Sequence, residues 1–238
     1  ALESLKALGA SITSTPDGFT AITTTLTPGI QDALPPGRSG PLAFMRELPI
    51  ERGQALLSRT DPALEALGRH VLDGALDPTL PDRERPARRA GVMRTSAVSK
   101  RTTLLLVRFR FQAEIPLADG STRPLVVEDA QFMGFEGTPE QATWLADESV
   151  QELATAEPSG SVPEDMARTA ASRVLDHLGD VTAHLDQKAD ELAVAILESH
   201  RRARSGAGAA RRGLKVAAQK PVDILGAYVY LPVAGGQA

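Results

Sequence analysis

Three side chains in the C-terminal half of the chain have the spacing of a metal site. His177, Asp180 and His184 follow one another at intervals of three and four residues, so a helix would place them on one face. Imidazole nitrogens and a carboxylate oxygen are ligands that Zn²⁺ accepts. Exposed His/Asp pairs are also common on solvated helices, and acidic residues surround this group. We therefore favour a solvated helix surface, with no bound metal and no cofactor, and keep the metal site as the alternative.

Motifs for other common reaction chemistries are missing from the sequence. The nucleotide-binding pattern G-x-x-x-x-G-K-[ST] has no match, because Ala and Arg follow the glycines at Gly206 and Gly208. The sequence has no G-x-S-x-G motif and no cysteine, which excludes a serine hydrolase of that type, disulfides and thiolate zinc sites. Glu128 and Asp129 are adjacent in a predicted strand, so they face opposite sides and cannot act as an acid/base pair. We therefore expect a protein without catalytic activity of its own; an enzyme with an unrecognised histidine site is the alternative.

Basic side chains are concentrated in two segments, residues 83–110 and residues 201–220, although the net charge of the chain is −4. Such clusters bind phosphates, but they also occur on solvated surfaces and at interdomain interfaces, which are the alternative here. Phe109 and Phe111 are expected in the core, so no aromatic platform supports single-strand binding. We assign tentative nucleic-acid contacts to Arg94, Lys100, Arg101, Arg108, Arg110, Arg201, Arg202, Arg204, Arg211 and Arg212.

The first basic segment includes the clearest strand pattern of the sequence. Apolar and polar residues alternate over Leu104–Ile115, which is typical of a half-buried strand in an antiparallel sheet. Asp119-Gly120 predicts a turn, and residues 125–135 form the returning strand. A turn centred there places Glu128 beside Gln112 and diagonal to Arg110, with which we expect it to form an ion pair. Further strands are predicted over residues 19–26, around 42–48 and over 224–231.

Helices are predicted in two parts of the chain. One helix runs from Pro62 to about Leu76, with Asp61 as its N-terminal cap. Residues 145–205 are also helical, with a short first helix and a break at 158–160.

Ser161 and Glu164 have the spacing of a capping box for the helix that follows this break. The apolar residues beyond it recur at helical intervals, which predicts a long amphipathic helix or a helical hairpin, with Gly179 as a weak point. These residues are Met166, Ala170, Val174, Leu178, Val181, Leu185, Leu192 and Ile196.

Together these elements predict an α+β fold, in which amphipathic helices pack on an antiparallel sheet and a long helix or helical hairpin occupies the C-terminal half. We expect a mixed α/β part over 1–140 and a long-helix part with a closing strand over 141–238, joined in one compact unit. Of the 238 residues, 42% are hydrophobic and 24% are charged, an ordinary globular composition. No apolar run approaches the roughly 20 residues of a transmembrane helix, and the first residues do not form a signal peptide. We therefore expect a soluble, cytoplasmic protein without membrane contact, and the missing initiator Met predicts a piece of a longer protein.

Three stretches of the sequence resemble segments of a known protein family. Residues 61–72 read DPALEALGRHVL and resemble a helix downstream of the motor in certain bacterial helicases. Residues 94–110 read RTSAVSKRTTLLLVRFR and look like the next segment of those proteins. Residues 221–232 read PVDILGAYVYLP and look like their C-terminal end. From about residue 15 to 232, the chain is similar to the C-terminal region of Swi/Snf-type superfamily 2 proteins, akin to the RNA-polymerase-associated ATPase of bacteria.

This resemblance implies an antiparallel sheet and long helices that follow two RecA-like motor lobes. It places the chain outside the ATPase motor, so no catalytic residue is carried over, and the helicase motifs find no match. The implied function is a non-catalytic accessory domain that docks on the motor lobes and contacts DNA, RNA or a protein partner such as RNA polymerase. The alternative is a protein–protein interaction module that uses the long amphipathic helix.

Overall fold

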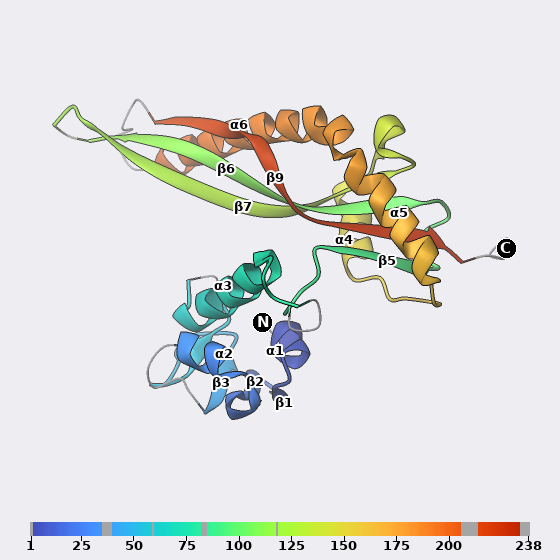
Figure 1. Ribbon diagram of the computed structural model, residues 1–238. Helices are drawn as coiled ribbons and strands as arrows, with labels where there is room; N and C mark the ends of the chain where they lie inside the picture. Colours follow the sequence, from blue (N-terminus) through green and yellow to red (C-terminus); the bar gives the residue numbers. More distant parts are fainter. Residues whose placement is uncertain are drawn as a thin grey trace. The chain divides into compact units, whose positions relative to one another are not determined.

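The computed structural model describes residues 2–34, 40–58, 60–81, 85–117, 119–205 and 214–233. The chain forms two compact units, Ala1–Arg88 and Arg89–Ala238, each with its own sheet and core (Figure 1). This division differs from the expected boundary after residue 140 and from the expected single unit. The physical reason is that strands before residue 140 and helices after it pack around one shared hydrophobic core.

The first unit combines a four-stranded sheet with three α-helices. Its elements are α1 Leu2–Ala7, β1 Ser11–Thr15, β2 Gly18–Ile22, η1 Thr23–Thr25, α2 Pro28–Ala33, β3 Pro41–Met45, β4 Ala55–Leu56 and α3 Pro62–Leu76. The sheet has the order β1-β2-β3-β4, in which the first two pairs are antiparallel and the last is parallel. Phe19 and Phe44 stack within its core, with ring centroids 4.8 Å apart.

Helix α3 begins and ends where the sequence predicts, and its cap is confirmed. Asp61 has an extended backbone, and its Oδ1 atom accepts a hydrogen bond from the N–H of Ala63 at 2.8 Å. The second carboxylate oxygen accepts from the N–H of Leu56 at 2.9 Å. One buried carboxylate therefore fixes the start of α3 and joins it to β4.

The second unit is built on a five-stranded sheet. Its elements are β5 Ala90–Thr95, β6 Thr102–Pro116, β7 Thr122–Glu136, η2 Pro139–Gln141, β8 Thr143–Trp144, α4 Asp147–Ala154, α5 Glu164–Asp176, η3 Leu178–Val181, α6 Thr182–Ser205 and β9 Lys215–Pro232. The strand order is β5-β9-β6-β7-β8, so the last strand of the chain lies inside the sheet. It runs parallel to β5 and antiparallel to β6. The predicted α+β fold is confirmed, with one parallel pair in each sheet.

One face of this second sheet forms the main core with the long helices. Strand β6 alternates as predicted, and it buries Leu105, Val107, Phe109 and Phe111 on one side. Apolar side chains of α5, η3 and α6 pack in the same cluster, through Val174, Val181, Leu185, Ala189 and Ala193. Figure 1 shows α6 running alongside β9. The middle of the predicted stripe is therefore buried within the unit, whereas Met166 at its start is 46% exposed.

The opposite face of the sheet carries α4 at the end where β6 begins. Val150 and Leu153 of this helix pack in a second cluster with Leu104 and Tyr230. The Tyr230 hydroxyl donates a hydrogen bond to the Leu153 carbonyl at 3.1 Å, so this buried polar group has a partner.

The predicted capping box before α5 is not formed. Pro163 occupies the N-cap position and offers no side-chain hydrogen bond, so Ser161 lies outside the helix. Glu164 and Asp165 stand in the first turn, where acidic side chains complement the helix dipole. Helix α5 ends at Asp176, and η3 connects it to the 24-residue α6.

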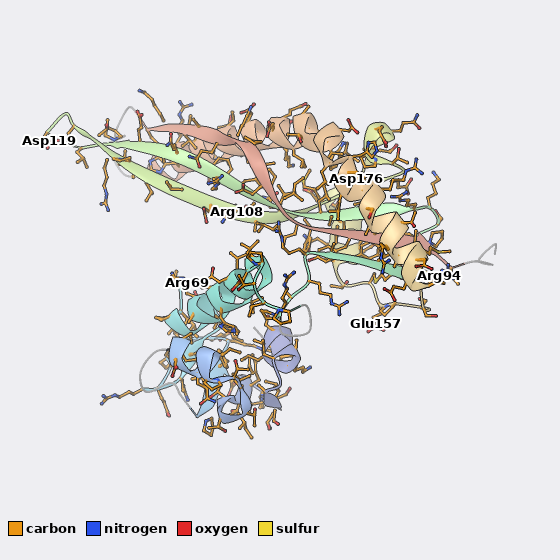
Figure 2. The ribbon with its side chains drawn as sticks, viewed as in Figure 1. Arg69, Arg94, Arg108, Asp119, Glu157 and Asp176 are labelled. Carbon is orange, nitrogen blue, oxygen red and sulfur yellow. The ribbon has the colours of Figure 1, made fainter. Side chains whose placement is uncertain are left out.

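The turn of the β6–β7 hairpin is symmetric about Asp119, which lies at its tip (Figure 2). The N–H of Leu117 donates to the Ser121 carbonyl at 2.8 Å, so the turn is wider than the two residues expected. Glu128 therefore lies directly opposite Arg110 and not diagonal to it.

Two other strands differ in extent from the predicted ones. Strand β2 ends at Ile22 because Thr23 turns into η1 and its hydroxyl donates a hydrogen bond to the Gly40 carbonyl. Strand β9 begins at Lys215, well before the expected start at residue 224, and its first residues pair with the end of β6. Both differences arise from partners far away in the sequence.

Candidate anion-binding site

Arg108 and Arg110 share one carboxylate on the face of β6 opposite the long helices α5 and α6. The alternation of the strand turns both away from the apolar core, and β9 places Asp223 opposite Arg108. Asp223 Oδ2 lies 3.0 Å from Arg108 Nη2 and 3.1 Å from Arg110 Nε. The expected ion pair between Arg110 and Glu128 is wrong, because β9 supplies a carboxylate that the β6–β7 hairpin alone does not contain. These two guanidinium groups are therefore partly neutralised within the sheet.

Other basic side chains also find partners inside the second unit. Lys100 lies 3.4 Å from Glu136, and Lys215 lies 3.2 Å from Glu114. Arg89 donates from its Nε atom to the carbonyl of Leu225 at 2.9 Å. These contacts link neighbouring segments of the sheet. The basic groups concerned are therefore already paired within the protein.

Arg94 and Arg101 lie against α5 and have incomplete hydrogen bonding. Arg94 Nη2 contacts the Met166 sulfur at 3.8 Å, and Arg101 Nη2 donates to the Ala170 carbonyl at 3.3 Å. The Nε atoms of both arginines are buried and have no hydrogen-bond partner in the described part of the chain. A buried donor without an acceptor costs roughly 1–3 kcal/mol, and more when it is charged. Figure 2 places Arg94 at the α5 end of the sheet, apart from Arg108.

A groove of about 500 Å³ lies beside Arg101, along α5. A second guanidinium, that of Arg173 on α5, lines the same groove and forms no hydrogen bond or ion pair with the residues that the structure describes. Burial, and then repulsion by Arg173, lowers the pKa of Arg101, while Glu140 opposes this shift. The remaining lining residues are Asp165, Met166, Thr169, Ala170 and Leu231. Two guanidinium groups beside apolar side chains can bind an anion with an apolar part, in competition with the negative charges of Asp165 in the groove and of Glu140 nearby.

The second basic segment is only partly described. Arg201 and Arg202 are exposed near the end of α6. The side chain of Arg204, and the whole of Arg211 and Arg212, lie outside the described residues. The structure therefore brings Arg101 to the groove, leaves Arg94 beside the same helix, and keeps Arg108 and Arg110 elsewhere on the sheet.

The structure assembles a histidine group, Glu140, His177 and Asp180, that differs from the set of His177, Asp180 and His184 suggested by the sequence spacing. His177 and Asp180 lie together, with Nδ1 and Oδ2 3.2 Å apart, but the third member is Glu140 of η2. His184 instead stacks on the ring of Trp144, with centroids 4.0 Å apart. Burial is the main cause that lowers the pKa of His184.

Arg173 and Glu140 are the two residues at these sites that the sequence does not single out. Arg173 lies among the polar positions of an amphipathic helix, and Glu140 follows a proline in a short turn. Neither position differs in its local pattern from an ordinary exposed charge, so only the three-dimensional arrangement identifies them.

A family model described as a domain of unknown function, DUF8741, matches residues 81–237. The chain belongs to the DUF8741 family. The matched region of this DUF8741 protein includes both the groove and the histidine group. No curated protein and no solved structure matches the chain. Among the described residues of the DUF8741 protein, no helix is long and apolar enough to cross a membrane.

Proposed function

We propose that this DUF8741 protein is a non-catalytic accessory domain of a cytoplasmic helicase or translocase ATPase, and that its groove contacts nucleic-acid phosphates. The observation that carries the phosphate contact is the pair Arg101 and Arg173, which line one groove, whereas Arg108 and Arg110 share the Asp223 carboxylate and Arg89 donates to a backbone carbonyl. A phosphate oxygen would give Arg101 the acceptor it lacks, and it would also reduce the repulsion between the two guanidinium groups.

The helicase part of the proposal rests on the segments that resemble the Swi/Snf-type proteins. Residues 94–110 and 221–232 are far apart in the sequence, yet they contribute to β5, β6 and β9, which are neighbours in one sheet. If the chain contains a domain of that family, the segments that resemble the family should pack together, as these two do. Docking on motor lobes, and contact with a partner such as RNA polymerase, belong to the same proposal.

An interaction module based on the long helix has less support. Val174, Val181 and Leu185 would have to face a partner in that case, but each is at most 1% exposed within the second unit. A partner would therefore have to bind another face of α6, and no described feature favours one.

Arg173→Ala is expected to weaken binding to nucleic acid and to reduce its salt dependence. The loss of one phosphate contact lowers the slope of log K against log salt concentration by about 0.9 for duplex DNA. Fluorescence anisotropy with labelled duplex DNA and single-stranded RNA, titrated over a range of salt concentrations, measures this slope. A slope that is the same in wild type and Arg173→Ala would contradict the proposed contact.

Two arginines provide matched controls for this experiment. Arg168 lies on the same helix and pairs with Glu164 at 2.7 Å, and Arg108 belongs to the pair held by Asp223. Alanine at either position removes the same formal charge, so a general electrostatic effect would change the slope in all three variants. We expect only Arg173→Ala to change it by about one phosphate contact.

The purified chain is also expected to hydrolyse no ATP, with or without nucleic acid, because it contains no match to the phosphate-binding loop. A coupled assay for released phosphate measures this. ATP turnover that stays with the chain through successive purification steps would contradict the non-catalytic role.

A further inference from the structure

A histidine nitrogen between two carboxylates lies where η2 approaches the end of α5. Glu140 Oε1 is 3.1 Å from His177 Nδ1, and Asp180 Oδ2 is 3.2 Å from the same atom. All three donor atoms lie within 4.8 Å of one another. We propose that Glu140, His177 and Asp180 bind a divalent transition-metal ion, with Zn²⁺ as the best fit. This proposal does not depend on nucleic-acid binding by the groove.

The distances between the donor atoms suit a small tetrahedral ion. Zinc binds histidine nitrogen and carboxylate oxygen at about 2.0–2.2 Å, so two ligands of a tetrahedral site lie about 3.4 Å apart. The two separations from His177 Nδ1 are close to this value, and small side-chain rotations can adjust the third. The side chains are 38–47% exposed, which leaves the fourth position to water.

The hydrogen-bonding capacity of histidine also favours an ion over a simple contact. A neutral imidazole carries one proton, and a single Nδ1–H cannot make two well-directed hydrogen bonds to two carboxylates. A lone pair on Nδ1 directed to a cation removes this conflict, because all three ligands then bind the same centre. A protonated histidine with two ion pairs is the competing description, and it predicts no metal uptake.

The backbone around the three ligands is regular, so their positions are held by the fold. The N–H of Asp180 donates to the His177 carbonyl at 3.1 Å within η3. The N–H of Gln141 donates to the Thr138 carbonyl at 3.0 Å within η2.

The ligand set and its surroundings indicate which ion would bind. An imidazole nitrogen with a water-accessible position suits zinc, whereas calcium and magnesium prefer oxygen ligands alone. The positive charges of Arg101 and Arg173 act on Glu140 and oppose a cation. We therefore expect reversible zinc binding rather than the tight binding of a four-ligand structural site.

The test is zinc titration by isothermal calorimetry, using the full chain without an affinity tag after treatment with a chelator. One zinc ion is expected per chain, and His177→Ala is expected to lower the affinity at least about tenfold, because the loss of a direct ligand should cost no less than the loss of an outer-shell partner. Glu140→Gln keeps the shape of the side chain and should also weaken binding. His200→Ala removes a histidine outside the site and should leave the affinity unchanged. Circular dichroism confirms that each variant is folded.

Substitution with Co²⁺ provides a second measurement that a change in folding does not imitate. A tetrahedral Co²⁺ complex absorbs visible light strongly, and we expect this absorption in the wild type and in His200→Ala but not in His177→Ala. No zinc uptake by the wild type, or equal uptake by wild type and His177→Ala, would overturn the proposal.

Discussion

Phe109→Ala is expected to lower the free energy of unfolding of the second unit by about 3–5 kcal/mol, the range for truncation of a fully buried phenylalanine. Phe109 lies in the middle of β6, is 0% exposed and belongs to the cluster that joins β6 to α6. Removing the ring leaves a cavity that a packed sheet and helix fill only in part. Urea denaturation measures the effect. The fluorescence of Trp144 follows this unit, because the chain contains one tryptophan.

Val126→Ala is the matched control for this prediction. Val126 lies on the neighbouring strand β7 but is 57% exposed, so its truncation should change the free energy of unfolding by no more than about 0.5 kcal/mol. Equal losses for Phe109→Ala and Val126→Ala would mean that the two faces of the sheet are wrongly assigned.

Gly18→Ala is expected to destabilise the first unit by about 3 kcal/mol, at the upper end of the range for overpacking. A Cβ atom at this position would lie 1.8 Å from the carbonyl oxygen of Phe44 and 2.9 Å from its carbonyl carbon. Both are backbone atoms of β3, so the clash is relieved only if β2 and β3 move apart. That movement would disturb the stacked Phe19 and Phe44 rings in the core.

The measurement must report on the first unit alone. The tryptophan and both tyrosines of the chain lie in the second unit, so Trp144 fluorescence should be unchanged while amide hydrogen exchange over residues 1–88 accelerates. Gly68→Ala is the control, because Gly68 lies within α3 and a Cβ atom there meets nothing within 4 Å. This second substitution should stabilise the unit by about 0.5–1 kcal/mol. Similar destabilisation by both would contradict the steric explanation.

The two basic segments show how far charge patterns lead towards a site. The sequence marks arginines as candidate contacts, but it cannot separate those that are paired from those that are not. Arg108 and Arg110 share the carboxylate of Asp223, which lies more than a hundred residues further along the chain and partly neutralises them. Arg101 meets Arg173 only because α5 packs beside the start of β6.

Several elements could be predicted from the sequence, because the interactions that specify them lie within a few residues of one another. The start of α3 follows from the Asp61 cap and the proline at the first helical position, which act within a few residues. The buried side of β6 follows from strict alternation, because successive side chains of a strand face opposite ways. The capping box predicted before α5 is wrong, because the helix begins two residues later than the Ser161 spacing requires, with Pro163 at the N-cap.

The position of β9, and the ion pairs of Asp223 that depend on it, follow from packing between distant segments. This strand lies between β5 and β6, where it supplies the carboxylate of Asp223, and no local pattern specifies the order of strands in a sheet. The meeting of Glu140 with His177 likewise requires η2 and η3 to pack together. The sequence determined which residues could carry charge or bind a metal ion; contacts between distant segments decided which of them are neutralised, which face the groove, and which share the proposed zinc site.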